Sequence, residues 1–515
     1  MVTVESNVTP SKYKRILATT DHRMIGKLYL VFAFVNFTIA GFFALVMRLE
    51  LVLPDQQFVQ PSDWGGLFTT HGLVMIFLAI FPLGAAFGNY MVPIMLKAKD
   101  LYWPRWNNIA FWMLVPASIL MYAGLLTSPG TGWYIYPPYS TADPSNNVDL
   151  FIIGILIAGV SSVIGSINFI LTILFMRSPE IPLNKMDMFS WGTFFTSLIQ
   201  ILATPIITTG LVMLLLSRFL GAGFFTSDAY AGPLLYQHVF WAYSHPAVYI
   251  MILPAMGLVS VLISKFSGNK IFGYTSMVVS MFAITFLGFV VWGHHMFTTG
   301  VNPTVTLSFT SITYVIAIPS GIKVFNWIST LYAGRIRLEA PMLFALAFIL
   351  GFILGGFTGV MVNVVPLDIN LHDTYFVVGH FHYIVIGGTV SAIFGTIYYI
   401  LPDMTGNMYN RKLALWHFWT WTIGFIMTFG AMLLLGTFGM PRRYFDFTDL
   451  PNFDMLSILN PIATIGAFLM AIAFLFFLYN LFWTVFKGPK AGDDPFNLGS
   501  TEMAPPTENV SGDVA

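Results

Sequence analysis

Long apolar runs separated by short polar segments follow one another along nearly the whole 515-residue chain. Twelve runs approach or exceed the ~20 residues that a helix needs to cross a hydrocarbon core. They cover about 27–47, 68–92, 108–127, 151–176, 191–217, 234–264, 272–296, 305–332, 341–364, 374–401, 412–436 and 461–486. Alternation in ~10-residue units, as in a membrane barrel, does not occur. The pattern predicts an all-α membrane protein, a bundle of twelve transmembrane helices whose backbone groups are satisfied internally.

The composition agrees with this pattern, since 57% of residues are hydrophobic and 9% are charged. The first run follows more than 20 mostly polar residues and has no small-residue cleavage site, which favours a retained span over a signal peptide. We expect an N-terminal segment (1–26), a catalytic membrane domain (27–487) and a disordered tail (488–515) rich in Pro, Gly and acidic residues. The net charge is zero and no basic cluster indicates nucleic-acid binding.

The distribution of basic residues predicts the orientation, because cytoplasmic loops retain Lys and Arg. With the N-terminus inside, 18 of the 23 basic residues lie in inner loops or at inner helix ends. Arg48, Arg218, Arg442 and Arg443 lie outside, and Lys323 lies within a span. Both termini are therefore expected in the cytoplasm.

The chain has no cysteine. This excludes a disulfide framework, covalent c-type haem attachment and any thiolate metal site within it. If soft-ligand electron carriers are needed, a partner subunit must supply them.

Six of the ten histidines are expected deep in apolar helices: His71, His245, His294, His295, His380 and His382. A single membrane histidine can simply form a hydrogen bond between helices. Six together favour metal binding, because ionisable side chains in spans are costly and usually functional. Imidazole also binds iron and copper without help from thiolate.

The spacing of these histidines predicts two centres. His380 and His382 are two residues apart and project on nearly opposite faces of a helix that turns ~100° per residue. One metal cannot easily bind both, so a centre is expected on each side of this helix.

A three-imidazole site is also expected. The adjacent His294 and His295 can reach one metal if the local helix is distorted or a third ligand arrives. His245 is a natural third ligand, because Pro246 interrupts the local hydrogen-bond ladder and lets the helix open. Three imidazoles with an open position suit copper. Tyr249 lies four residues after His245, on the same helical face.

Motifs along nearly the entire chain resemble subunit I of the haem–copper oxygen reductases, the cytochrome c oxidase type. They include TTDHRMIGKLY, HGLVMIFLAIFP, FGNYMVP, GTGWYIYPP, HPAVY, VVWGHHMFTTG, AIPSGIKVF, HDTYFVVGHFHY and PRRYFDF. The resemblance implies a low-spin haem bound by His71 and His382, a high-spin haem bound by His380, and one copper bound by His245, His294 and His295. It further implies that Tyr249 is covalently joined to His245.

The resemblance also implies roles for further residues of this chain. Arg442 and Arg443 match the pair that binds haem propionates, with Trp133 at the same haem edge; a basic anchor at the headgroups is the alternative for the two arginines. Arg48 matches the residue that hydrogen-bonds the formyl of haem A, although haem O or B stays open. His372 and Asp373 match an outer magnesium site.

Two proton routes are implied as well. The first uses Lys323, Ser320, Ser260 and Tyr249; a lysine here costs about 2.5–3.5 kcal/mol at mid-membrane, and snorkelling towards the cytoplasm is the alternative. The second uses these polar residues: Asp100, Asn89, Asn107, Ser161, Ser162 and Asn168. Many relatives end this route with a glutamate where Ala247 stands here. The chain resembles the subgroup in which Tyr243 and Ser244 replace that carboxylate.

The implied activity is the four-electron reduction of dioxygen to water coupled to proton pumping in a prokaryotic cytoplasmic membrane. Expected partners are a subunit II with a dinuclear copper site, which passes electrons from cytochrome c, a subunit III and small subunits. A quinol oxidase is the first alternative. A nitric oxide reductase would have carboxylates around a second iron, and a twelve-span transporter has no need of six buried imidazoles.

Overall fold

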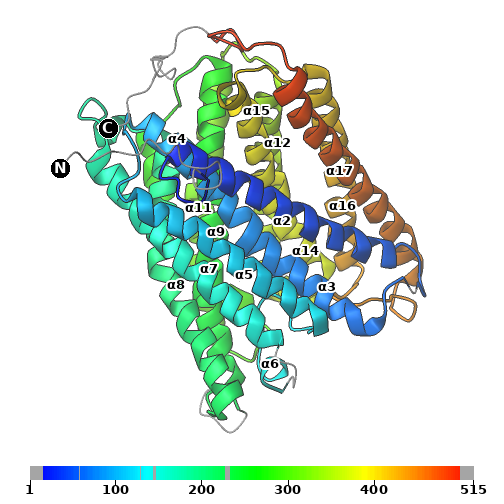
Figure 1. Ribbon diagram of the computed structural model, residues 1–515. Helices are drawn as coiled ribbons and strands as arrows, with labels where there is room; N and C mark the ends of the chain where they lie inside the picture. Colours follow the sequence, from blue (N-terminus) through cyan, green and yellow to red (C-terminus); the bar gives the residue numbers. More distant parts are fainter. Residues whose placement is uncertain (1–15, 57, 128, 143–146, 227–231, 499–515) are drawn as a thin grey trace, which may run out of the picture.

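The computed structural model describes residues 16–498, apart from 57, 128, 143–146 and 227–231, as a bundle of long helices (Figure 1). Within this part there is no β-strand, only the isolated bridges Thr374–Pro441 and Asn407–Lys490. The helices are α2 (His22–Glu50), α3 (Pro61–Leu73), η1 (Val74–Ile80), α4 (Phe81–Met95), α5 (Pro104–Gly124), η2 (Leu125–Thr127), α6 (Tyr139–Ala142), α7 (Asn147–Leu171), η3 (Thr172–Met176), η4 (Leu183–Lys185), α8 (Met188–Leu220), α9 (Gly232–Ser267), α10 (Tyr274–Leu287), η5 (Trp292–Met296), α11 (Pro303–Leu331), α12 (Ala340–Val362), α13 (Val365–Leu371), α14 (Tyr375–His382), η6 (Tyr383–Val390), α15 (Ser391–Thr405), α16 (Arg411–Thr437) and α17 (Phe453–Lys487).

Each of the twelve predicted runs corresponds to one helix or to helices joined end to end. Ten of these units are long and apolar enough to cross a membrane within the described part of the chain. The eleventh, α5, begins with Arg105, Asn107 and Asn108, which lower its hydropathy. The twelfth, α10, has 14 residues, and the rest of its predicted run is a turn followed by η5. The chain is therefore a multi-pass all-α membrane protein, and only the run at 272–296 is not continuous helix.

Local sequence explains where the helices begin and end. The Asp21 carboxylate accepts a hydrogen bond from the Arg23 backbone N–H, and the Asn410 side chain accepts from Lys412 and Leu413. Such caps satisfy the free N–H groups of a first turn. Gly221 ends α8 in the left-handed conformation, with φ of 66°.

Helices that follow one another in sequence pack side by side, notably α5 with α7, α8 with α9, and α16 with α17. Close approach of α16 and α17 depends on glycine, since a Cβ on Gly424 would lie 2.7 Å from the Gly466 carbonyl oxygen. In the most apolar stretch of α9, 83% of residues are buried, against 11% in α11. The helix that carries His245 therefore lies in the centre, and α11 lies at the edge.

Two π-helical segments interrupt the spans that carry the expected ligands. η1 begins three residues after His71, and η6 begins directly after His382. π-turns inside α-helices are rare and are often found at functional sites. By contrast, α9 continues without interruption through Pro246, so the expected opening of this helix at the proline is wrong.

The end of α15 and the loop after it contact both the first span and the segment that follows the last span. The Lys27 ammonium donates to the Met404 carbonyl oxygen at 3.3 Å, and the Met408 backbone N–H donates to the Pro489 carbonyl oxygen at 2.7 Å. Residues 489–498, expected to belong to a disordered tail, instead pack on the bundle, and the Phe496 side chain is buried there. The remainder of that tail, 499–515, lies outside the described residues, as do residues 1–15 of the N-terminal segment.

Candidate metal centres

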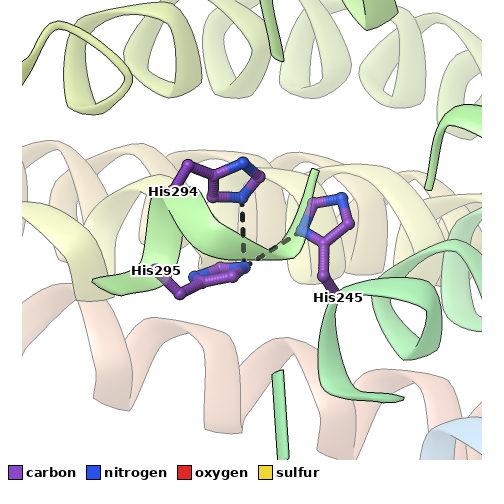
Figure 2. Close-up of side chains that lie close together, drawn as sticks. All are labelled: His245, His294 and His295. Carbon is purple, nitrogen blue, oxygen red and sulfur yellow. Dashed lines mark hydrogen bonds between the residues drawn. The ribbon is translucent and has the colours of Figure 1, made fainter. Parts of the chain in front are cut away.

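His245, His294 and His295 form one compact cluster of imidazoles (Figure 2). The Nδ1 atom of His245 lies 3.0 Å from Nε2 of His295, and Nε2 of His294 lies 3.1 Å from the same atom. Metal–imidazole bonds of about 2.0 Å, the length known for zinc, hold two ligand nitrogens about 3–3.5 Å apart. The three side chains are therefore already spaced as ligands of one metal ion.

The two adjacent histidines reach this cluster because their segment is not α-helical. α10 ends at Leu287, and His294 and His295 lie on the tighter 3₁₀ helix η5. The backbone allows this conformation partly because Gly293 has no side chain: a Cβ there would lie 2.3 Å from the Phe309 ring. A distorted helix was one of the two conditions expected to let this pair reach one metal, and the structure has it.

Neighbouring groups orient the cluster. The Thr313 hydroxyl donates to the Phe309 carbonyl oxygen and so accepts from Nδ1 of His294, 3.0 Å away. This arrangement leaves the other nitrogen, Nε2, free as a ligand, which is the usual role of an outer partner at a metal-binding histidine. The Trp241 ring stacks on His295 at 3.9 Å. Sequence reasoning missed both residues, although Trp241 lies four residues before His245 and shares its helical face.

Tyr249 packs against the cluster from the same helix. Its ring centre lies 5.0 Å from that of His245, at a steep angle. A Cβ on Gly288 would lie 2.7 Å from the Tyr249 ring, so this glycine provides the space for it. The predicted proximity of Tyr249 and His245 is confirmed.

His380 and His382 point to different neighbours. His380 lies within electrostatic range of His294 and His295, whereas His382 lies within that range of His71. The Nδ1 atoms of these histidines are bonded to backbone carbonyl oxygens: His71 to Ala40 at 2.8 Å, His380 to Gly355 at 3.0 Å and His382 to Val378 at 2.8 Å. All three Nε2 atoms thus remain available for iron. The expected division between the two faces of α14 fits this arrangement.

Small residues and a second hydroxyl surround these histidines. A Cβ on Gly359 would lie 2.9 Å from the His380 ring, and a Cβ on Gly72 would lie 3.2 Å from Trp133. The Thr358 hydroxyl lies 3.0 Å from Nδ1 of His380. The glycines let these rings pack close to the backbone, and the donor set is the one that haem iron accepts. The residues present therefore fit two haems and one copper.

Arg48 is buried beside α17. One terminal nitrogen donates to the Asn460 carbonyl oxygen at 3.0 Å and to the Asn460 side chain at 2.8 Å. The other terminal nitrogen and Nε are buried without a partner among the described residues. A buried guanidinium with free donors is costly unless it binds an acceptor. The expected acceptor, a haem substituent, fits this position.

One end of the site carries a cluster of opposite charges. Arg442 forms an ion pair with Asp373, and the Arg443 guanidinium lies 3.6 Å from the same carboxylate and 4.5 Å from the centre of the Tyr134 ring. Burial raises the pKa of Asp373, but the charges of Arg442, Arg443 and His372 outweigh it, so the pKa is lowered overall. Burial also lowers the pKa of Arg443 to about 10. Nε of Arg442 is buried without a partner among the described residues.

The two expected magnesium ligands have other partners here. Nδ1 of His372 lies 3.1 Å from the Asp368 carboxylate, while Asp373 turns to the arginines. The magnesium site stays a prediction.

Lys323 is fully buried on α11. Its Nζ atom has no hydrogen-bond partner among the described residues and lies 5.2 Å from the centre of the Trp327 ring. The Trp327 indole N–H donates to the Ser260 hydroxyl at 2.9 Å. Snorkelling to water is thereby excluded for Lys323. The Ser320 hydroxyl donates back to the Ile316 carbonyl oxygen at 3.1 Å and makes no hydrogen bond to Lys323 in the described part of the chain.

The second set of polar residues borders an internal cavity of about 80 Å³. Asn107 donates to the Asn89 side chain at 2.5 Å, and both residues line the cavity together with Ser161, Ser162 and Tyr243. Asp100 and Asn168 are not part of its lining. Asn168 instead holds the Trp103 backbone at 2.8 Å, at the start of α5.

Asp100 lies at the loop before α5. Burial raises its pKa, an effect that the hydrogen bond from the Leu101 backbone N–H and the charge of His22 partly offset. A carboxyl group with a raised pKa exchanges protons nearer to neutral pH than a free one. Its position suits the mouth of a proton route.

The structure separates the expected Tyr-Ser pair. Tyr243 faces the cavity, whereas Ser244 is not among the lining residues, and its buried hydroxyl has no partner within the described part. Adjacent residues on an α-helix diverge by ~100°, so Tyr243 lines the cavity and Ser244 does not.

Comparisons with known proteins agree with the site. Residues 24–490 match the family model "Cytochrome C and Quinol oxidase polypeptide I". The chain is 44% identical to "Cytochrome c oxidase polypeptide 1" of Halobacterium salinarum, over 96% of this chain and 83% of that one. It is also 44% identical to "Cytochrome c oxidase subunit 1" of Synechocystis, over 94% and 87%. The fold is similar to a chain in a cryo-EM structure of a haem–copper terminal oxidase dimer, with a TM-score of 0.75, 21% identity and coverage of 91% and 84%.

Proposed function

Because the chain belongs to the cytochrome c and quinol oxidase polypeptide I family, we propose that it reduces dioxygen to water and pumps protons at the same time. It is an oxidoreductase, the catalytic subunit I of a terminal oxidase, and the family uses haem and copper. The observation that carries the proposal is the cluster of three imidazoles with Tyr249 packed against it, together with His380 in electrostatic range of His294 and His382 in range of His71.

We assign to each metal the ligands that the family resemblance implies. His71 and His382 would hold the low-spin haem and His380 the high-spin haem, while His245, His294 and His295 would hold the copper. When bound, the haems and copper supply the electron transfer and the oxygen chemistry. Arg48 would donate hydrogen bonds to a haem A substituent, and Arg442, Arg443 and Trp133 would hold the propionate edge. His372 and Asp373 would bind magnesium.

Residues of the chain itself would carry the protons and define the two routes that they follow. Tyr249 would give a proton close to the three-histidine cluster, and its contact with His245 is compatible with the proposed cross-link. Lys323, with Ser320 and Ser260, would bring protons to Tyr249. Asp100 would collect protons for the second route, which continues past Asn89 and Asn107 to Ser161 and Ser162. Asn168 would shape the entrance.

Partners and location belong to the same proposal. Electrons would come from cytochrome c through a subunit II with a dinuclear copper site, beside subunit III and small subunits. The complex would lie in a prokaryotic cytoplasmic membrane with both termini of this chain inside. The family also includes quinol oxidases, in which subunit II would lack that site. The all-histidine composition of the cluster supports copper over the carboxylate-supported iron of a nitric oxide reductase.

Metal analysis of single variants in the purified complex tests the ligand assignment. We expect His295→Ala to lose one copper per complex and to keep the low-spin haem spectrum. His71→Ala or His382→Met should lose the low-spin haem and stop electron entry.

A buried histidine outside these centres provides the control. His417 bonds to the Tyr398 hydroxyl at 3.0 Å, and His417→Gln should retain all metals. Loss of both haem spectra with full copper in His295→Ala would show that the ligand assignment is wrong.

A further inference from the structure

One face of α8 is polar inside the membrane domain. Thr193, Ser197, Gln200 and Thr204 are spaced four, three and four residues apart, which aligns their side chains along the helix. All four are buried. The first and last members, Thr193 and Thr204, are eleven positions apart, which corresponds to about 16 Å of helix. This length is roughly half of a ~30 Å hydrocarbon core. The sequence analysis treated this segment only as an apolar span.

The four residues line the same cavity as Asn89, Asn107 and Tyr243. Its volume of about 80 Å³ has room for several waters, since by this measure a single water needs only ~10–15 Å³. The cavity therefore lies between the polar entrance at Asn107 and the helix that carries the cluster ligand His245.

The lining groups need partners that the protein does not supply. The hydroxyl oxygens of Thr193 and Thr204 are buried without a hydrogen-bond partner among the described residues. The Gln200 side-chain oxygen accepts from the Ser166 hydroxyl at 3.2 Å, and its amide nitrogen donates to no described protein atom. Cavities that stay dry are apolar, whereas a polar cavity with several free groups binds water.

We propose that the α8 row holds ordered waters that connect Asn107 to Tyr243, with Gln200 as the main positioning residue. This inference rests on the second proton route of the proposed function. Protons would pass along the waters by exchange of hydrogen bonds, and no side chain of the row would change its charge. Gln200 fixes the direction of this chain, because one end of its amide is bound to Ser166 and the other is free for water.

Pumping measurements in vesicles test the role of the row. Gln200→Leu combined with Thr204→Val removes the central polar groups at similar volume. We expect protons pumped per electron to fall by about twofold or more, with a smaller fall in oxygen uptake. The matched control is Thr209→Val on the same helix, whose hydroxyl bonds back to Pro205 and does not line the cavity. This control should pump normally.

Two further measurements keep the inference separate from the route on which it rests. A high-resolution map of the native complex should show waters bonded to Gln200, and the same density should be lost in Gln200→Leu. If the double variant does not assemble, Thr204→Val alone serves, since it keeps the side-chain shape. Normal pumping in the α8 variants while Asp100→Asn stops pumping would overturn the inference alone. Normal pumping in both would overturn the route as well, and a dry native cavity would overturn the inference.

Discussion

Around Lys323 the interior of the bundle holds one amine that has no hydrogen-bond partner among the described residues. The cavity beside α8 has hydroxyl and amide groups among the apolar side chains of its lining and no charged side chain. The amine lies over the Trp327 ring, on a helix at the edge of the bundle. The cavity lies between central helices, and its polar groups come from at least four of them.

The two regions would move protons by different means. An isolated lysine carries a proton by gaining and losing its own charge, and the cost of that charge in the membrane favours rapid loss. A water chain carries protons without a charged side chain, but only while its hydrogen bonds are ordered. One region thus depends on a single residue, and the other depends on many weak contributions.

The largest effect is expected from Lys323→Met, which removes the amine and keeps the length of the side chain. Turnover should fall by about 100-fold, within the usual range for loss of a positioned proton carrier. Electrons should still reach the low-spin haem, which stopped-flow spectra can follow. Lys185→Met, an exposed lysine on η4, is the control and should leave turnover unchanged. Normal oxygen uptake in Lys323→Met would remove the lysine from the route.

A smaller and different effect is expected from Tyr243→Phe with Ser244→Ala. Each charge moved against 100 mV costs about 2.3 kcal/mol, so a disordered path that leaks protons reduces pumping before it slows oxygen reduction. Protons pumped per electron should therefore fall more than turnover does, as measured in vesicles.

The single variants sharpen this result. Tyr243 lines the cavity and Ser244 does not, so Tyr243→Phe should reproduce most of the loss and Ser244→Ala little of it. An unchanged pumping ratio in the double variant would mean that this pair does not replace the missing carboxylate.

The smallest effect is expected from Trp327→Phe, which breaks the hydrogen bond to Ser260 and keeps an aromatic ring near Lys323. Loss of about 1 kcal/mol at this step would slow turnover about fivefold. Trp419→Phe, at an exposed position on α16, is the control. If turnover in Trp327→Phe falls as far as in Lys323→Met, the lysine does not act alone and the contrast between the two regions is lost.

The spans and the histidine cluster were predictable because they depend on run length and on local spacing. His380 and His382 diverge by helical geometry alone, and the cost of burying six imidazoles points to metals. The roles of Arg48, Asp100 and Lys323 came instead from the family resemblance, and they stay proposals.

Other features depend on contacts across the bundle, which a single sequence does not contain. Thr313 orients His294 from a different helix, and Thr358 lies beside His380 in the same way. The polar row of α8 was missed because threonine and glutamine scarcely change the hydropathy of a long apolar run. The end of α10 at Leu287 was missed because the residues that follow it are as apolar as those of a continuous helix.

The π-turn η6 allows ligand direction and helix packing to be set separately. Its hydrogen bonds close over one more residue than those of an α-turn, so the segment stores an extra residue between His382 and α15. An α-helix that gained one residue without such a segment would turn its two halves by about 100° relative to each other. The π-turn absorbs that residue locally, so the histidines of α14 and the packing face of α15 can each keep their own direction.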